Sequence, residues 1–380
     1  MQSKPERVRF DCRHFVGDRP CRLHKAEGVK CQTCSYYDPV KTRVLVIKLG
    51  AMGDVLRTTS ILPALNNRYD SPHITWVTVR ESLGLLENNP WIHSLMAVES
   101  ASLARLFTET YDLVLNPETA KESAALASMA RGKEKKGFGL APEGYVFPLN
   151  QGAEEIFQMG LFDDVKKANR KTYEQLICQL SGLPFGRVSP VLHLTQENLR
   201  FGEAFRKKRR LQSSKPVIGL NTGGGGRWPL KQWTTKGFVE LARRLIDRVG
   251  AQVLLFGGPE EKETNRRILS QAKGNVVDTG CSNSTREFAA LLNLCDVVVT
   301  GDSLAMHIAL ALGRRVVVLF GPTSAAEIDV YDRGQKVMAE MDCLCCYRQS
   351  CDRSPNCMES LSVDTVFHAV EEETRCAGKR

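Results

Sequence analysis

The feature that most constrains this chain is the segment 43–63, where a β-branched apolar run passes through a glycine turn into a helical pattern. The apolar run stops at Lys48, Gly50 and Gly53 follow, and Asp54 precedes apolar residues at helical spacing. This order predicts a strand, a turn and a helix, with the Asp54 carboxylate at the carboxyl end of a parallel strand. Active-site clefts of α/β sheets form at that edge, although a carboxylate there can also simply cap the helix.

The same alternation of strand and helix patterns runs through most of the chain. In the first half, strands are predicted at 43–49, 73–79, 94–98 and 111–116, and helices at 54–69, 101–109, 119–131 and, as one longer helical region, 152–182. In the second half, strands are predicted from 216 and at 252–256, 275–278, 296–300 and 315–320, and helices at 233–249, 260–272, 284–294, 303–312 and 362–376. Such alternation is typical of parallel sheets with helices on both faces.

The expected architecture is an α/β protein of two similar domains with a cleft between them. At 380 residues the chain is long enough for two domains of ordinary size. The predicted divisions are a cysteine-rich leader over 1–41, a first domain over 42–190, a connector over 191–215, a second domain over 216–342, and a cysteine cluster with a C-terminal helix over 343–380.

The composition, 42% hydrophobic and 25% charged, is typical of a globular protein in water. No apolar run approaches the roughly 18 residues that span a bilayer, and the N-terminus lacks the apolar core of a signal peptide, so a cytoplasmic location is expected. The net charge of +9 suits anionic partners. The densest basic run, 206–210, is predicted to be a solvated linker helix, and without a basic–aromatic signature no nucleic-acid partner is expected.

Several loops that follow strands in the second half carry groups suited to phosphate. Glycines at 223–226 allow backbone N–H groups to approach an anion closely, and Arg227 and Lys231 lie beside them. Ser303 precedes a predicted helix, whose N-terminal N–H groups also favour phosphate. Since these loops converge on one sheet edge, they predict a site for a nucleotide diphosphate. The candidates in these loops include Thr222, Gly223, Gly224, Gly321 and Thr323.

Three further side chains at this edge have alternative interpretations. Glu261 can accept hydrogen bonds from ribose hydroxyls or satisfy a helix N-terminus. Asp302 can hold sugar hydroxyls, whereas His307, about one turn into an apolar helix, is more often a packed core residue. No Walker loop, nucleophile elbow or strand-following Gly-x-Gly-x-x-Gly is present, which disfavours a dehydrogenase.

Taken in order, four motifs resemble those of the ADP-heptose:lipopolysaccharide heptosyltransferases, glycosyltransferase family nine. They are Gly50-Ala-Met-Gly-Asp54-Val-Leu-Arg-Thr, Arg227-Trp-Pro-Leu-Lys-Gln-Trp233, Gly301-Asp302-Ser-Leu-Ala-Met-His307 and Gly321-Pro-Thr323, and the resemblance covers about residues 43–370. It implies a GT-B architecture, in which two Rossmann-like domains with parallel sheets face each other across a cleft. The first domain would receive the acceptor and the second the nucleotide sugar.

The resemblance also implies the chemistry and its residues. The implied enzyme is an inverting glycosyltransferase that moves a heptose or related sugar from a nucleoside diphosphate, ADP-heptose, to lipopolysaccharide or another cell-envelope saccharide. Asp54 would be the general base that deprotonates the acceptor hydroxyl. On the donor side, Ser303 and Leu304 would lie at the phosphate-binding helix N-terminus, with Thr222 and Gly223 in the phosphate loop, Glu261 near the ribose and Asp302 at the sugar. The acceptor-side candidates are Gly53, Arg57 and Glu118.

Two places depart from the family pattern. Gly226 stands where the family often has lysine, so Arg227 or Lys231 is expected to supply that charge. Asn116-Pro-Glu-Thr-Ala-Lys-Glu-Ser123 differs from the family's Asp-x-Gln-Gly-Leu-x-Lys-Ser, which leaves the acceptor and donor sugar open. No paired Asp-x-Asp is present, and no metal is expected at the transfer site. The implied partners are a nucleotide-sugar donor and a lipid-linked or lipopolysaccharide acceptor at the inner membrane face, where the protein would be cytoplasmic or peripheral.

The thirteen cysteines gather in two clusters. In a reducing cytosol such clusters suggest metal before disulfides. The leader spacing favours structural zinc over an iron–sulfur cluster or metal-free thiols, with Cys12, Cys21, Cys31 and Cys34 as ligands. A weaker metal prediction falls on the second cluster, at Cys343, Cys346, Cys351 and Cys357. The isolated Cys178, Cys281 and Cys295 are expected to be packing residues.

A hypothesis from another class makes the chain a metal-dependent binding protein, or a catalytically degenerate transferase, that uses the leader to recognise a partner. The intact Asp54, Asp302 and glycine loop argue against degeneration.

Overall fold

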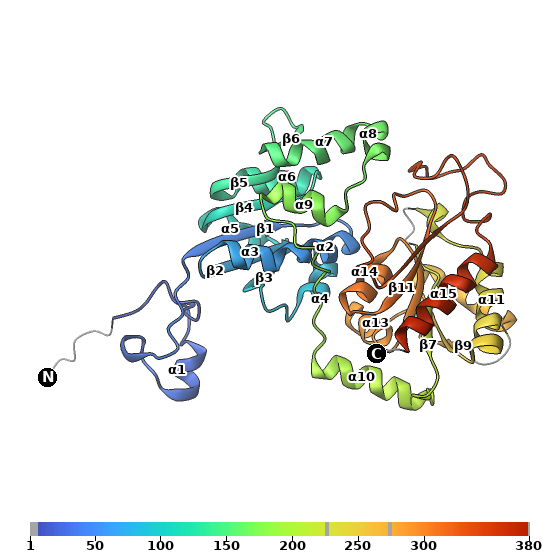
Figure 1. Cartoon of the computed structure of the whole chain (residues 1–380). Helices are drawn as coiled ribbons and strands as arrows, with labels where there is room; N and C mark the ends of the chain where they lie inside the picture. Colours follow the sequence, from blue (N-terminus) through green and yellow to red (C-terminus); the bar gives the residue numbers. More distant parts are fainter. Residues whose placement is uncertain (1–6, 225–227, 273–275, 379–380) are drawn as a thin grey trace.

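The computed structural model describes residues 7–224, 228–272 and 276–378, and each half of the chain is built on a six-stranded sheet (Figure 1). The first sheet has the order β3-β2-β1-β4-β5-β6, with β1 (Thr42–Ile47), β2 (Pro72–Thr78), β3 (Ser94–Ala97), β4 (Thr110–Asn116), β5 (Arg131–Leu140) and β6 (Val146–Pro148). The second has the order β12-β11-β10-β7-β8-β9, with β7 (Val217–Asn221), β8 (Gln252–Phe256), β9 (Val276–Asp278), β10 (Val297–Gly301), β11 (Arg315–Phe320) and β12 (Gly334–Met338).

The central strands are continuous apolar runs because helices cover both faces of each sheet. In β1, Val44, Leu45, Val46 and Ile47 are all 0% exposed, and β1 pairs in parallel with β2 and β4. In the second sheet, β7 occupies the same place between β8 and β10. Only β6 is antiparallel to its neighbour among the described strands. The strand order therefore reverses beside β1 and beside β7, and these switch points are where ligands bind in such sheets.

Helices connect the strands on both faces. The leader contains α1 (Arg22–Glu27) and η1 (Cys31–Thr33). The first domain contains α2 (Met52–Thr58), η2 (Thr59–Ile61), α3 (Leu62–Arg68), η3 (Arg80–Ser82), α4 (Leu83–Leu86), α5 (Ser100–Thr108), α6 (Lys121–Met129), η4 (Gln151–Ala153), α7 (Glu154–Leu161), α8 (Asp163–Ala168) and α9 (Tyr173–Ser181). The linking helix is α10 (Gln196–Lys208). The second domain contains η5 (Pro229–Lys231), α11 (Thr235–Arg244), η6 (Leu245–Val249), η7 (Pro259–Glu261), α12 (Lys262–Gln271), α13 (Thr285–Leu292), α14 (Leu304–Ala311) and α15 (Val363–Ala377).

The predicted alternation is confirmed for the apolar strands, but polar strands and helix breaks were not predicted. β5 begins Arg-Gly-Lys-Glu-Lys-Lys and β12 carries Gln335 and Lys336, so neither reads as a buried apolar run. The predicted helix 54–69 is interrupted by η2 at 59–61, and the predicted helical region 152–182 contains the end of η4 and three separate α-helices. The last of these, α9, begins at a capping box in which Thr172 and Gln175 each bond the other's backbone N–H, which fixes a new start within the region.

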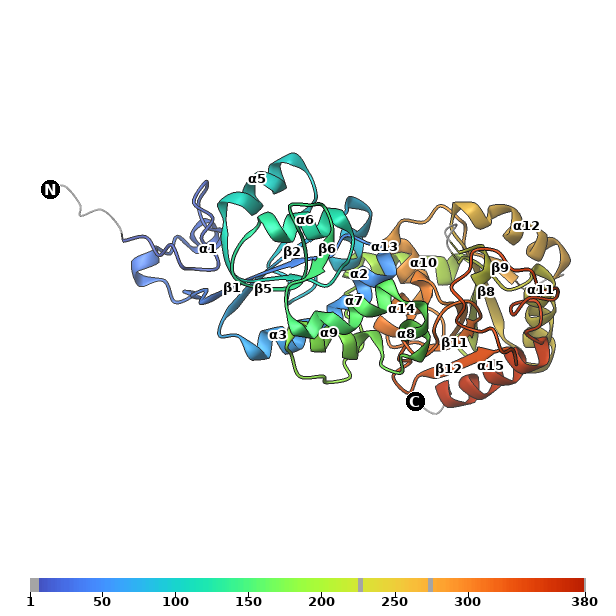
Figure 2. The ribbon, with the colours of Figure 1, turned by 90° about the horizontal axis from the view of Figure 1, so that it is seen from above.

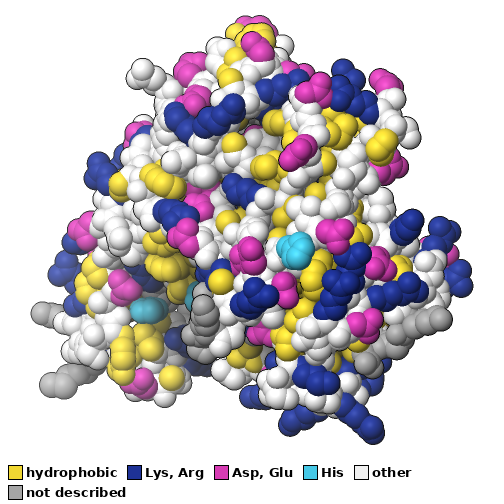
Figure 3. All heavy atoms as spheres, turned by 45° about the vertical axis from the view of Figure 1, so that its right-hand side comes forward, with side chains coloured by type: hydrophobic (Ala, Val, Ile, Leu, Met, Phe, Trp, Pro, Cys, Tyr) yellow, Lys and Arg dark blue, Asp and Glu magenta, His cyan; other side chains and the backbone are white. Residues whose placement is uncertain are grey.

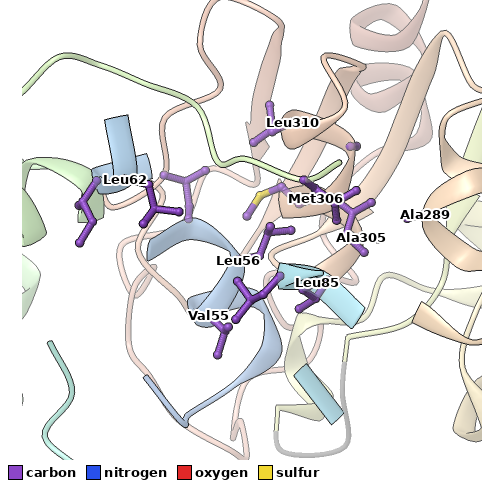
Figure 4. Packing of buried hydrophobic residues seen from close by; sticks show 14 of the residues in the cluster. Val55, Leu56, Leu62, Leu85, Ala289, Ala305, Met306 and Leu310 are labelled. Atoms are coloured by element: carbon purple, nitrogen blue, oxygen red, sulfur yellow. The ribbon is translucent and has the colours of Figure 1, made fainter. Parts of the chain in front are cut away.

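The two domains pack directly on each other through an apolar interface. Figure 4 shows α2 and α4 of the first domain facing α13 and α14 of the second, and the labelled residues belong to one buried cluster that crosses the boundary. They are Val55, Leu56, Leu62, Leu85, Ala289, Ala305, Met306 and Leu310, none more than 2% exposed. Full burial of a large apolar side chain stabilises the folded chain by about 1.5–3 kcal/mol, and part of this burial comes from the facing domain. The interface therefore fixes how the two switch points face each other.

The cysteine-rich leader lies on the side of the first domain away from the second, in both Figure 1 and Figure 2. Arg13 attaches it there, because its guanidinium donates to the Pro72 carbonyl at 2.8 Å and to the Asp38 carboxylate at 2.8 Å. At the other end of the chain, α15 packs on the second sheet and buries Val366 and Val370. None of the helices in the described ranges is long and apolar enough to cross a membrane.

Candidate active site

A cavity of about 900 Å³ lies between the domains, at the carboxyl ends of β1, β7 and β10. It brings together most of the candidate residues from both halves of the sequence. Those in its wall are Gly53, Asp54, Arg57, Gly223, Gly224, Lys231, Asp302, Ser303, Leu304, His307 and Thr323. The helical turn after β1 thus faces the glycine loop after β7 and the helix start after β10.

Asp54 lies in the first turn of α2 and is held by Arg57 one turn further on. The Arg57 Nη2 atom is 2.8 Å from Asp54 Oδ1. On its other side, the guanidinium lies 3.7 Å from the centroid of the Tyr173 ring, whose hydroxyl shares a 2.7 Å hydrogen bond with Thr58. The Asp54 carboxylate is therefore fixed in direction while 36% of its side chain stays exposed to the cavity.

The charges around Asp54 keep it ionised. Burial alone would raise the pKa of the Asp54 carboxyl, but Arg57, Lys48 and His307 outweigh burial and lower this pKa to about 2. Burial and, after it, the positive charge of Arg57 lower the pKa of His307 to about 4. At neutral pH the cavity wall therefore presents a carboxylate at Asp54 and an uncharged imidazole at His307.

His307 is both a packed residue and part of the cavity wall. It lies in α14 and is 6% exposed. A Cβ atom at Gly53 would be 2.8 Å from His307 Cδ2, closer than real Cβ atoms approach, so glycine at 53 allows α2 and α14 to touch. Sequence reasoning placed Gly53 on the acceptor side; its local role is to admit this contact between the domains.

The buried neutral state of His307 predicts acid-sensitive stability. Because the pKa of His307 is about 4 in the folded protein and about 6.5 when unfolded, the unfolded state binds more protons between these values. The contribution is intact above pH 6.5 and is lost as the pH falls towards 4, by about 3 kcal/mol in total. Urea unfolding at pH 7 and pH 4.5 should show a smaller loss of stability in His307→Gln than in the unmodified protein. The surface variant His24→Gln controls for removal of an imidazole, and equal losses in all three proteins would contradict the prediction.

On the second domain, Asn221 ties the glycine loop to the end of β10. Its Nδ2 group donates to the Gly223 carbonyl at 2.9 Å and to Thr300 Oγ1 at 3.0 Å. Ser303 is the N-cap of α14, and its side chain makes no capping bond to the helix backbone. The first N–H groups of α14 thus remain without a side-chain cap beside the cavity, as an anion-binding helix start requires. Asn221 was not among the predicted site residues. The signal that could have identified it is a polar residue at the end of a buried strand, just before the glycine run.

Asp302 and Lys231 form an ion pair within the cavity wall. Lys231 Nζ lies 2.8 Å from Asp302 Oδ2, the same oxygen that accepts a 2.9 Å hydrogen bond from the Thr323 hydroxyl. Burial would raise the pKa of the Asp302 carboxyl, but Lys231 outweighs it and lowers the pKa. Both charges are thereby partly neutralised, and three segments distant in sequence converge on one carboxylate.

Other predicted site residues lie behind the cavity wall. The Thr222 hydroxyl is buried 2.6 Å from Asn265 Oδ1, and Glu261 accepts a 2.8 Å hydrogen bond from the Gly258 N–H at the start of η7. A Cβ atom at Gly321 would be 2.6 Å from Cys357 Sγ, so the cysteine-rich segment covers that glycine. Arg227 lies outside the described residues.

Glu118 supports the turn that leads into α2. Its Oε2 atom accepts a 2.8 Å hydrogen bond from the Leu49 N–H, and its Oε1 atom lies 3.6 Å from Lys48 Nζ. The two side chains are only 5% and 10% exposed. A Cβ atom at Gly50 would lie 1.9 Å from Glu118 Oε1, so the backbone passes directly over the carboxylate. Glu118 therefore acts on the loop before Asp54 and is not itself in the cavity wall.

The cavity wall also contains residues that sequence reasoning did not select. Lys166 comes from α8, Glu327 from the loop after β11, and Tyr347 from the second cysteine cluster. Trp228 was quoted within a motif but given no role, and Cys281, which was predicted to pack in the core, also lines the cavity. Nothing local in the sequence marks Lys166 or Tyr347, because only the packing of α8 and the cysteine-rich segment brings them to the cavity.

The predicted metal sites are not confirmed. Within the described residues, which include every cysteine, no three His, Cys, Asp or Glu side chains are arranged to hold one ion. In the leader, Cys12 pairs with Pro39 in an isolated bridge, Cys21 precedes α1 and Cys31 begins η1, so the thiols lie on separate short elements. In the second cluster, burial raises the pKa of the Cys357 thiol, and the nearby sulfurs of Cys346 and Cys343 raise it further. The structure therefore does not confirm a zinc or iron–sulfur site at either cluster.

Comparison with known proteins gives a consistent result. Residues 101–356 match the family model described as glycosyltransferase family 9 (heptosyltransferase). Lipopolysaccharide heptosyltransferase 2 of Escherichia coli strain K12 is 26% identical over 297 residues, covering 74% of this chain and 83% of that protein. The crystal structure of a family 9 glycosyltransferase from Veillonella parvula superposes with a TM-score of 0.70 at 19% identity, covering 88% of this chain and 98% of that one. The structure of E. coli ADP-heptose lps heptosyltransferase II superposes with a TM-score of 0.66 at 22% identity, covering 88% of this chain and 99% of that one. The predicted arrangement of two Rossmann-like domains, the GT-B architecture, is thereby confirmed.

Proposed function

Because this chain belongs to glycosyltransferase family 9, we propose that its cavity transfers a heptose or a related sugar, with inversion, from ADP-heptose to a saccharide of the cell envelope. The observation that carries the proposal is that one cavity is lined by Asp54 from the first domain and by the start of α14 and the glycine loop from the second. A base and an anion-binding edge in the same cavity are what transfer from a nucleoside diphosphate requires. The first domain, over 42–190, would receive the acceptor, and the second, over 216–342, the donor.

The second domain offers the donor diphosphate several hydrogen-bond donors. They are the uncapped N–H groups at the start of α14, the backbone around Gly223 and Gly224, and the ammonium of Lys231. Donors that are already oriented stabilise the negative charge that develops as the diphosphate leaves. Asp302 would hold the hydroxyls of the sugar, and Glu261, behind Gly223, would reach the ribose only by exchanging its bond to the Gly258 N–H.

In the proposed reaction Asp54 takes the proton of an acceptor hydroxyl. The oxygen then forms a bond to the anomeric carbon while the bond from that carbon to the diphosphate oxygen breaks. One displacement from the opposite face inverts the anomeric configuration, and ADP leaves with the electron pair. Arg57 holds Asp54 in its ionised form beforehand, and the bound acceptor would have to weaken this 2.8 Å pair for Asp54 to accept a proton efficiently.

The acceptor and its location rest on the relatives. The relatives of this chain include lipopolysaccharide and lipooligosaccharide heptosyltransferases, which supports a lipopolysaccharide or lipid-linked acceptor at the inner membrane face. A protein that meets such an acceptor would be cytoplasmic and peripheral to that membrane. On the face shown in Figure 3, Lys and Arg side chains lie interspersed with Asp and Glu side chains.

Nucleotide binding tests this function directly. ADP and ADP-heptose should stabilise the purified protein, and a ligand at a hundred times its Kd raises the unfolding free energy by about 2.7 kcal/mol. The measurement is a thermal-shift series with ADP, UDP and GDP and their sugars, followed by NMR of the anomeric configuration of the product. UDP and GDP serve as the matched controls. Lack of stabilisation by every nucleotide would remove the proposal, and a retained anomeric configuration would remove the single displacement.

A further inference from the structure

The cations of the cavity wall differ in their partners. Arg57 is paired with Asp54 at 2.8 Å, and Lys231 with Asp302 at 2.8 Å. Lys166 also lines the cavity, but within the described ranges no carboxylate lies within 4.0 Å of its ammonium. It is half-buried on α8 of the first domain, whereas its neighbour Lys167 is exposed and outside the wall. Lys166 is thus a cavity cation with no carboxylate at ion-pairing distance in the part of the chain that the structure describes.

An aromatic ring from the second cysteine cluster contacts this ammonium. Lys166 Nζ lies 3.7 Å from the centroid of the Tyr347 ring, which is close enough for a cation–π interaction. The ring is fixed in turn, since the Tyr347 hydroxyl donates to Glu327 Oε1 at 2.9 Å and accepts from the Ser324 N–H at 3.2 Å. A π-face orients an ammonium without neutralising it. Lys166 therefore remains able to pair with an anion.

The cysteine-rich segment places Tyr347 at the cavity. Its backbone bonds directly to the loop after β11, where the Cys345 N–H donates to the Gly321 carbonyl at 3.1 Å and the Tyr347 N–H donates to the Pro322 carbonyl at 2.8 Å. The same loop carries Thr323, which bonds Asp302. Tyr347 is thereby linked to the donor side of the cavity, while Lys166 belongs to the first domain.

We propose that Lys166 binds an anionic group of the bound substrates and that Tyr347 positions its ammonium for this contact. The inference rests on the proposed function and adds a residue of the first domain to substrate binding. The anion is a phosphate of the donor or an acidic group of the acceptor, since either can supply the charge that Lys166 lacks. A charge-assisted hydrogen bond to such a group strengthens binding about tenfold.

The test compares Lys166→Gln with Lys167→Gln by calorimetric titration of the full-length protein. The probes are ADP and a deacylated, heptose-free lipopolysaccharide core fragment that keeps its phosphates. If Lys166 binds the donor, its variant should weaken ADP binding about tenfold while Lys167→Gln stays within about twofold of the unmodified protein. If Lys166 binds the acceptor, only binding of the core fragment should weaken. If the unmodified protein does not bind the fragment, the ADP comparison alone decides.

Two variants separate positioning by Tyr347 from a general structural effect. Tyr347→Phe keeps the π-face and should bind both probes within about twofold of the unmodified protein, whereas Tyr347→Leu should weaken the Lys166-dependent probe about two- to fivefold. Equal affinities for Lys166→Gln and Lys167→Gln would overturn the inference, provided that the unmodified protein binds ADP. A protein that binds no nucleotide would instead contradict the proposed function, so the two failures are distinguishable.

Discussion

Replacing Asp54 with asparagine is expected to lower kcat for sugar transfer by about 10²–10⁴-fold, the range over which a positioned general base contributes. The amide keeps the shape of the side chain but cannot accept the acceptor's proton. Since Asp54 lies on the first domain and the anion-binding groups on the second, the Kd for ADP should change by less than about twofold. Single-turnover transfer and ADP titration on the same preparation measure the two quantities.

The control for this experiment is Asp70→Asn, which removes an exposed carboxylate paired with Lys41. It should retain both transfer and ADP binding. Asp54→Asn also leaves Arg57 without its partner, so a second variant, Asp54→Asn with Arg57→Met, separates loss of the base from the effect of an unpaired cation. Normal turnover by Asp54→Asn would rule out this aspartate as the base, even if the fold and donor site are as described.

Replacing Glu118 with alanine should lower the unfolding free energy by about 3–5 kcal/mol, because it leaves the buried Lys48 ammonium without a counter-charge. Lys48 is 4% exposed, so water cannot replace the lost carboxylate. The change also removes the acceptor of the Leu49 N–H in the turn before α2. Transfer should therefore fall as well, through displacement of Asp54. Chemical denaturation and steady-state kinetics measure the two effects.

The double variant Lys48→Met with Glu118→Leu distinguishes an unpaired charge from loss of shape. Removing both charges should restore much of the stability, since apolar replacements of a buried ion pair are often neutral. The matched surface pair is Lys41 and Asp70, whose side chains are 57% and 69% exposed, and Asp70→Ala should cost no more than about 1 kcal/mol. If Glu118→Ala is no more destabilising than Asp70→Ala, the supporting role of Glu118 is wrong.

The parts of the fold that follow from local pattern could be predicted from the sequence. The run into β1, the glycine turn and α2 read directly as strand, turn and helix, and the same pattern located β10 and α14. β5 could not be found in this way, because its side chains are mostly charged and it is held by pairing with β4. Such a strand forms because it pairs with a strand that is distant in sequence, and a short stretch of sequence gives no sign of that pairing.

The residues of the candidate site also fall into those that the sequence pattern predicts and those that only tertiary packing brings to the cavity. Asp54, Asp302 and Ser303 follow buried strands, so topology brings them to the carboxyl edges of the two sheets, and the packing of the domains brings these edges to one cavity. Thr222 and Glu261 were selected by motif, yet their polar atoms bond Asn265 and Gly258. Lys166 and Tyr347 reach the cavity only through the packing of segments that carry no motif. The metal sites predicted from the cysteine spacings are not confirmed, and spacing alone does not determine how short turns orient their thiols.

The apolar cluster that joins α2 and α4 to α13 and α14 has a consequence for how the molecule comes apart. Separating the domains would expose side chains that are now at most 2% accessible, such as Leu56 and Met306, so neither half gains a water-compatible surface by leaving the other. The chain should therefore melt as a single cooperative unit. If the cavity widens to admit substrates, we expect these helices to shift against each other while the apolar interface between them stays closed.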